Sequence, residues 1–112
     1  MSTYTPDRWV VLKLTRGSDV TYKVLAGWYG GYCGSDSWQL NSGIVRVVDR
    51  GAAYEFYGHS GSVYTCYKAS RGMSGVMLGI YGRLQEQATE LPGYGVEVSD
   101  DWDSRLEVKL FS

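Results

Sequence analysis

The stretch RWVVLKLTRGSDVTYKVLA, from Arg8 to Ala26, carries the clearest structural pattern in the chain. Apolar side chains alternate from Val10 to Leu14, which predicts a half-buried β-strand. Arg-Gly-Ser-Asp at positions 16–19 predicts a tight hairpin turn, and the segment Val20 to Ala26 predicts the returning strand. We therefore expect an antiparallel pair of strands early in the chain.

Short segments rich in β-branched and aromatic residues predict further strands. Glycine, asparagine and aspartate separate these segments, as is typical of turns. The last two segments flank Ser-Asp-Asp-Trp-Asp and are expected to pair as another hairpin. The predicted strands are SWQL (37–40), IVRVVD (44–49), AAYEFY (52–57), VYTCYK (63–68), GVEV (95–98) and RLEVKLF (105–111).

A different period begins at Met73, where apolar residues recur at intervals of three and four up to Ala88. This spacing predicts an amphipathic α-helix, with Ser74 as its N-terminal cap and Pro92-Gly93 beyond its end. The expected fold class is therefore α+β: a mostly antiparallel β-sheet of about six to eight short strands, with one amphipathic helix packed on it.

Three glycines, Gly75, Gly79 and Gly82, share the helix face opposite the apolar stripe. A glycine in a helix interior costs about 1 kcal/mol relative to alanine, and solvent exposure does not require that cost. One interpretation is that another segment of this chain, or a partner protein, approaches the helix backbone there. The other is a glycine-rich sequence that is poorly optimised for a helix.

The composition is that of one folded domain. Hydrophobic residues make up 44% and charged residues 21%, which suits a packed core and not a disordered chain. We expect a single domain over residues 1–112. Lys and Arg number 11 against 12 Asp and Glu, so the net charge of -1 supplies no field that would attract nucleic acid or an anionic membrane.

The opening residues MSTYTPDR have neither the basic nor the apolar region of a signal peptide, and no run reaches the roughly 18 apolar residues of a membrane span. We expect a soluble, cytoplasmic protein. Cys33 and Cys66 are then expected to be reduced thiols and not a disulfide. Neither cysteine has a neighbour at zinc-ligand spacing, and we expect no metal and no cofactor.

Two glycine-rich loops raise a question of topology. They read GWYGGYCGSDSW (27–38) and GHSGS (58–62). If Asn41-Ser42-Gly43 is a turn between two strands, a simple meander sends the loops to opposite ends of the sheet. If Gly43 instead marks a bulge in one long strand from 37 to 49, both loops fall at the same end. The sequence leaves both arrangements open.

The first loop combines bulky aromatic side chains with glycines. We expect Trp28 and Trp38 to be core anchors that flank it. The functional interpretation is a recognition surface, since antibody loops likewise combine tyrosines with small adaptable residues. Converging loops would add polar groups from the second loop to the same surface. The candidate ligand- or partner-contacting residues are Trp28, Tyr29, Tyr32, Asp36, Ser37, His59, Ser60, Ser62 and Tyr64.

Catalytic patterns are weak. GHSGS lacks the second glycine of a hydrolase nucleophile elbow, because Ser62 occupies that position. His59 is the only histidine, which excludes a multi-histidine metal site. It could act as a general base, yet no nucleophile or orienting carboxylate can be assigned to it. We assign no catalytic residue, and a small enzyme using His59 is the third functional hypothesis. Asp100, Asp101 and Asp103 are expected to form a solvated turn.

The segments YKVLAGWYGGY, SWQLNSGI and GHSGSVY resemble short, uncharacterised proteins encoded in bacteriophage and prophage genomes. The resemblance covers roughly the middle of the chain and carries over no activity and no functional residue. It implies a phage context, in which small soluble proteins include inhibitors of host defence systems that bind a protein or sequester a nucleotide signal. The implied location is the cytoplasm of a bacterial host.

We therefore expect a non-enzymatic binding protein, a phage-encoded accessory or anti-defence inhibitor that occludes a host protein through its aromatic, glycine-rich loops. The alternative is a protein that binds or sequesters a nucleotide-like small molecule. A nucleic-acid partner is not expected, because the basic residues are scattered among acidic ones. Predicted edge strands and the glycine face of the helix leave a homodimer open.

Overall fold

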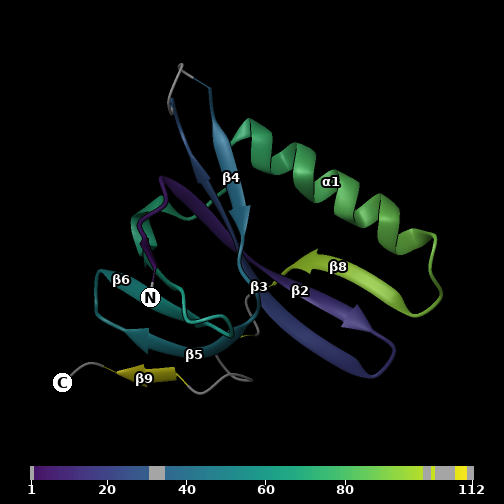
Figure 1. The fold of residues 1–112 in the computed structure, drawn as a ribbon, viewed down its shortest axis with the longest axis horizontal. Helices are drawn as coiled ribbons and strands as arrows, with labels where there is room; N and C mark the ends of the chain where they lie inside the picture. Colours follow the sequence, from purple (N-terminus) through teal and green to yellow (C-terminus); the bar gives the residue numbers. More distant parts are fainter. Residues whose placement is uncertain (1, 31–34, 100–101, 103–107, 111–112) are drawn as a thin grey trace.

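The structure is a computed structural model that describes residues 2–30, 35–99, 102 and 108–110. Its strands form two sheets, and the α-helix found in this part of the chain, α1 (Gly75–Thr89), lies against one of them (Figure 1). The expected α+β fold class is confirmed. No helix in the described ranges is long and apolar enough to cross a membrane.

The sheet next to α1 is antiparallel throughout. Its strand order is β4-β3-β2-β8. The expected first hairpin is confirmed: Arg16 pairs with Asp19, and Gly17 adopts a φ of 61° in the turn between them. The four strands are β2 (Arg8–Arg16), β3 (Asp19–Trp28), β4 (Ser37–Leu40) and β8 (Tyr94–Val98).

The second sheet has the order β1-β7-β6-β5-β9. Its three middle strands are antiparallel, whereas β1 and β9 add to its edges in parallel. A short 3-10 helix, η2 (Lys68–Ser70), follows β7. The strands are β1 (Thr3–Tyr4), β5 (Ile44–Asp49), β6 (Ala53–Gly58), β7 (Val63–Tyr67) and β9 (Val108–Leu110).

The β2–β3 hairpin lies between two apolar layers. Trp9 and Val11 point into a core shared with the five-stranded sheet, while Val10 and Leu12 point into a second core under α1. The expectation of a half-buried strand was therefore wrong for this part of β2. The reason is that the strand belongs to a middle layer, which is covered on both faces by elements from distant parts of the chain.

Helix α1 agrees closely with the sequence prediction. Its apolar stripe packs on the four-stranded sheet, and the Met77 N–H donates to Ser74 Oγ at 3.4 Å as the expected cap. The helix ends at Thr89, before Pro92. The close approach at this interface involves Gly27 of β3, because a Cβ atom there would lie 2.5 Å from Met77 Sδ.

The expected hairpin at the end of the chain was wrong. β8 pairs with β2 in one sheet, whereas β9 pairs with β5 in the other. Between these two strands lies Trp102, which is buried against Tyr54 and Phe56 with ring centroids 5.0 and 5.2 Å away. Burying a large aromatic side chain draws the chain to the second sheet, so the two strands cannot close on each other.

The segment Asn41–Gly43 carries the chain from one sheet to the other. β4 and β5 are separate strands, as in the turn alternative, but they belong to different sheets. Asn41 completes the first sheet: its N–H donates to the Val24 carbonyl at 3.0 Å, and its Oδ1 accepts from the Val24 N–H at 2.8 Å. The side-chain oxygen of Asn41 thus accepts the hydrogen bond that a main-chain carbonyl of β4 would accept if the strand continued. The backbone is then free to turn toward the second sheet.

Candidate functional site

The exposed end of the β3–β4 hairpin is held by hydrogen bonds around Tyr29. The Tyr29 N–H donates to Asp7 Oδ2 at 2.9 Å, and Arg8 Nε donates to the Tyr29 hydroxyl at 3.2 Å. The Gly30 N–H donates to Asp36 Oδ1 at 2.9 Å. The Tyr29 side chain is still 49% exposed. We call Tyr29, Gly30 and Asp36 the hairpin tip.

Trp28 was predicted both as a core anchor and as a candidate contact residue, and the structure places it as a core anchor. Its ring packs edge-on against Tyr4 at 6.2 Å, and its Nε1 donates to the Thr5 carbonyl at 3.1 Å. Ser37 is exposed and pairs with Trp28 in the β3–β4 ladder. Tyr32 lies outside the described residues.

Tyr64 belongs to the core and not to a surface patch. Its side chain is 1% exposed, its ring stacks on Tyr4 at 4.9 Å, and its hydroxyl accepts from Gln39 Nε2 at 2.7 Å. Burial raises the pKa of this hydroxyl. The residue lies on a strand whose inner face meets the four-stranded sheet, which its sequence position alone did not reveal.

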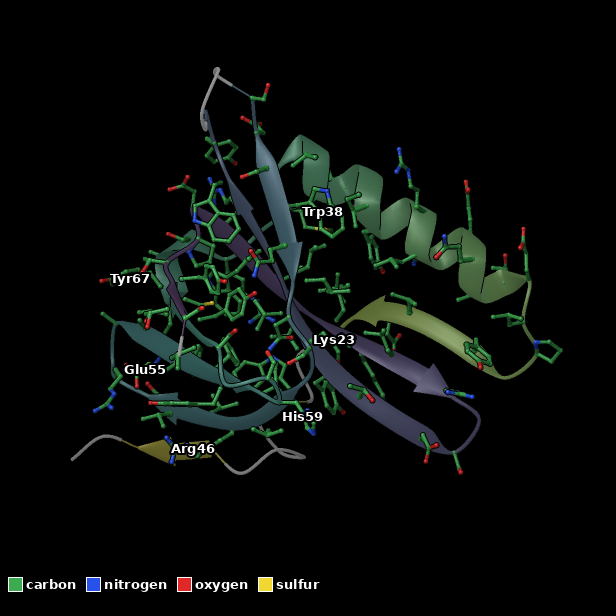
Figure 2. The ribbon with its side chains drawn as sticks, in the orientation of Figure 1. Lys23, Trp38, Arg46, Glu55, His59 and Tyr67 are labelled. Atoms are coloured by element: carbon green, nitrogen blue, oxygen red, sulfur yellow. The ribbon has the colours of Figure 1, made fainter. Side chains whose placement is uncertain are left out.

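The second glycine-rich loop lies at the opposite end of β4 from the hairpin tip. The His59 N–H donates to the Gly43 carbonyl at 2.8 Å, and the Ser60 N–H donates to Ser42 Oγ at 2.9 Å. Figure 2 shows His59 beyond the end of β4 that lies farther from the tip. The two loops therefore do not converge, and the predicted residues divide into two separate groups.

A groove of about 460 Å³ lies beside His59. The imidazole is exposed, and within the described ranges no hydrogen bond or ion pair engages it. Ser62 is half-buried in the same loop. Hydroxyl, imidazole and main-chain groups with apolar flanks suit a polar small molecule. The lining residues are Val20, Thr21, Tyr22, Ser42, Gly43, Ile44, Val45 and His59.

Trp38 was expected in the core, and that expectation was wrong, since its side chain is 43% exposed. Figure 2 shows it on the side of β4 that faces α1. β4 is the last strand of its sheet, so nothing in the described structure covers the outer side of the ring. The alternation in SWQL places Trp38 and Leu40 on one face, but no sequence signal identifies the strand as an edge.

The three helix glycines face open space. A Cβ atom at Gly75, Gly79 or Gly82 would meet no atom within 4 Å. The interpretation that another described segment of this chain approaches the helix there was therefore wrong. A partner protein on this face stays a hypothesis.

Two ion pairs between described residues lie near the turn between β5 and β6, away from the tip. Lys68 Nζ contacts Asp49 Oδ1 at 2.8 Å, and Arg50 Nε contacts Glu55 Oε1 at 2.9 Å. The hydrogen bond from Lys68 lowers the pKa of Asp49. In the part of the chain that the structure describes, no group of three His, Cys, Asp or Glu side chains could hold a metal ion.

Comparisons with family models, with curated proteins and with solved structures give no match.

Proposed function

We propose that this is a non-enzymatic binding protein that docks on a partner protein through the hairpin tip. The observation that carries the proposal is the exposed Tyr29 ring, which is hydrogen-bonded at both its main chain and its hydroxyl. A large aromatic surface that is already ordered loses little conformational entropy on binding. Such a residue is typical of an interface anchor.

The partner in this proposal is a host protein, and the chain is a phage-encoded accessory or anti-defence inhibitor. The resemblance of its central segments to phage and prophage proteins supports this context. The near-neutral net charge of -1 supports docking by shape and aromatic contact over binding to a polyanion.

The test begins with native mass spectrometry of the protein purified from a bacterial host, which identifies a stoichiometric partner. The affinity of that complex is then measured for Tyr29→Ala. Truncating an interface anchor costs more than about 1.4 kcal/mol, so we expect at least about a tenfold rise in Kd.

Tyr67→Ala is the matched control, because Tyr67 is similarly exposed at 47% but lies on β7 of the five-stranded sheet, whereas Tyr29 lies at the β3–β4 hairpin of the other sheet. We expect its Kd to equal that of the wild type. An unchanged affinity in Tyr29→Ala would remove the tip from the interface.

The groove beside His59 favours a second candidate function, the binding of a nucleotide-like small molecule. Its volume of about 460 Å³ and its mixed polar and apolar lining carry this alternative. A discrete low-mass adduct in the same native mass spectrum would support this function. The adduct should disappear in Val45→Trp, because the larger side chain fills the rim of the groove. An adduct that persists in that variant would place the ligand elsewhere.

A further inference from the structure

The two edge strands of the four-stranded sheet differ in whether their outward main-chain groups are hydrogen-bonded. On β8, the outward main-chain groups are covered by the helix: the Val98 N–H donates to the Tyr81 hydroxyl at 3.3 Å, and Gln85 Nε2 donates to the Val96 carbonyl at 3.4 Å. β4 forms the opposite edge. No described residue hydrogen-bonds to its outer side.

The ladder shows which groups of β4 are unpaired. The Asn41 N–H donates to the carbonyl of Val24, the residue directly opposite, so this is a hydrogen-bonded pair of the antiparallel ladder. Hydrogen-bonded and non-hydrogen-bonded pairs alternate along such a ladder. Gln39 therefore turns its main-chain groups toward β3. Trp38 and Leu40 turn theirs outward, where two N–H groups and two carbonyls have no partner among the described residues.

The sequence of β4 does nothing to protect this edge. Ser-Trp-Gln-Leu contains no charged side chain and no proline, whereas edge strands of monomeric proteins usually carry such residues or a bulge. The exposed Trp38 ring adds an apolar surface beside the unpaired groups. An open edge with an exposed aromatic side chain is a site for adding another strand.

We propose that two copies of this chain pair through β4, antiparallel, about a two-fold axis at Gln39. In this register Trp38 lies opposite Leu40 of the second copy, and each pair exchanges two hydrogen bonds, so all four outward groups of each strand are satisfied. The two four-stranded sheets become one continuous sheet across the dimer.

The second copy is favoured as the occupant because the edge is complementary to itself. The same axis places Asp36 opposite Ser42 of the other copy, so no like charges face each other. Trp38 meets the aliphatic Leu40 side chain on the same face of the joined sheet, which covers the exposed ring. The small net charge of -1 adds little repulsion between copies.

This inference goes beyond the proposed function and does not depend on it. β4 runs from the hairpin tip toward Asn41, so antiparallel copies place their two tips at opposite ends of the joined strands. Both Tyr29 side chains stay accessible. The dimer would present two docking surfaces to partner proteins.

The first test is the mass in solution, measured by sedimentation equilibrium. We expect twice the 12.5 kDa mass of the chain for the wild type. Trp38→Pro removes one outward N–H and is compatible with an edge strand, so it should give a folded monomer by circular dichroism. Trp38→Ala keeps that N–H and should weaken the dimer less. Leu78→Ser, at an exposed residue of α1, is the control and should stay dimeric.

The second test reports the register. The proposed axis places the two Gln39 residues as a non-hydrogen-bonded pair about 4.5 Å apart between Cα atoms, within disulfide range. In a Cys33→Ser background, Gln39→Cys should therefore form an intermolecular disulfide on oxidation. Trp38→Cys should not, because its equivalents lie on a diagonal about 7–8 Å apart.

Three outcomes would overturn the proposal. One is a wild-type protein that stays monomeric at about 0.1 mM. Another is a dimer that persists in folded Trp38→Pro. The last is cross-linking of Trp38→Cys in preference to Gln39→Cys, which would show a different register. None of these outcomes bears on the docking role proposed for Tyr29. That role would be contradicted separately, by an unchanged affinity in Tyr29→Ala.

Discussion

Gly27 of β3 faces the buried side of α1, whereas Gly79 lies on the exposed side of α1 itself. The space around the two glycines differs accordingly. A Cβ atom at Gly27 would lie 2.5 Å from Met77 Sδ and 3.1 Å from Ser74 Oγ, whereas one at Gly79 would meet nothing within 4 Å. Glycine therefore permits a close strand-to-helix contact at one position and only weakens the helix at the other.

We expect Gly27→Ala to lower the free energy of unfolding by about 1–3 kcal/mol, because the added methyl group overpacks the interface. Gly79→Ala should raise it by about 1 kcal/mol through helix propensity. Urea denaturation of the two variants measures both values. Shifts of the same sign would contradict the assigned packing.

Cys66 gives a second prediction at this scale. Its side chain is fully buried in the core between the sheets, and burial raises the pKa of its thiol. The thiolate is the reactive form, so the native thiol should be inert at neutral pH. In a Cys33→Ser background, we expect no reaction with a disulfide thiol reagent until urea unfolds the chain. Rapid labelling of the native protein would show that this core opens easily.

The candidate site was predictable from sequence only in part. Tyr29 and Asp36 were predicted as loop residues near the surface, and both lie at the hairpin tip. Trp38 and Tyr64 were misplaced because exposure depends on whether a strand is at the edge or the centre of its sheet. That property arises from pairing between distant segments, which a local pattern does not contain.

At the scale of elements, α1 is a case in which nearby residues are enough to predict the structure. Its apolar stripe and its Ser74 cap follow from residues within a few turns of each other. The strands at the end of the chain show the opposite case. GVEV and RLEVKLF both carry strand patterns, yet β8 pairs with β2 in one sheet and β9, residues 108–110 of the second segment, pairs with β5 in the other.

The ion pair between Asp49 at the end of β5 and Lys68 in η2 links two elements and predicts a pH dependence. The pKa of Asp49 is lowered, so its contribution to stability is present above the usual value of 3.8 and is lost as the pH falls through the lower folded value. The pKa of Lys68 is raised, so its contribution is lost only as the pH rises above 10.5 and through the folded value.

We therefore expect Asp49→Asn to be slightly less stable than the wild type at pH 7, with the difference vanishing in acid. The effect should be small and should shrink in high salt, because both side chains contact solvent. Thermal unfolding across pH measures it. A difference that persists below the folded pKa of Asp49 would assign it to lost packing and not to charge.

At the scale of the whole molecule, Trp102 joins the end of the chain to the core between the sheets. It is buried and packs edge-on against Tyr54 and Phe56. Trp102→Ala should lower the free energy of unfolding by about 3–5 kcal/mol, as expected for a buried aromatic residue cut to alanine. Chemical denaturation provides the measurement.

Trp38→Ala is the matched comparison, because it removes the same side chain from an exposed position. Its effect on the unfolding of the monomer should be much smaller than that of Trp102→Ala. If Trp102→Ala lowered the free energy of unfolding as little as Trp38→Ala is expected to do, Trp102 would not hold the C-terminal segment to the core.

The sequence by itself determined the α+β class, the first hairpin, the extent of α1 and the loop position of the tip residues. Each depends on neighbours within a few residues, through side-chain periodicity, turn chemistry and capping. Only the tertiary structure decided that the strands form two sheets, that Asn41–Gly43 crosses between them, and that β4 is an open edge. These features depend on which distant strands pair, and that choice is made by the burial of large side chains such as Trp9 and Trp102 across the whole chain.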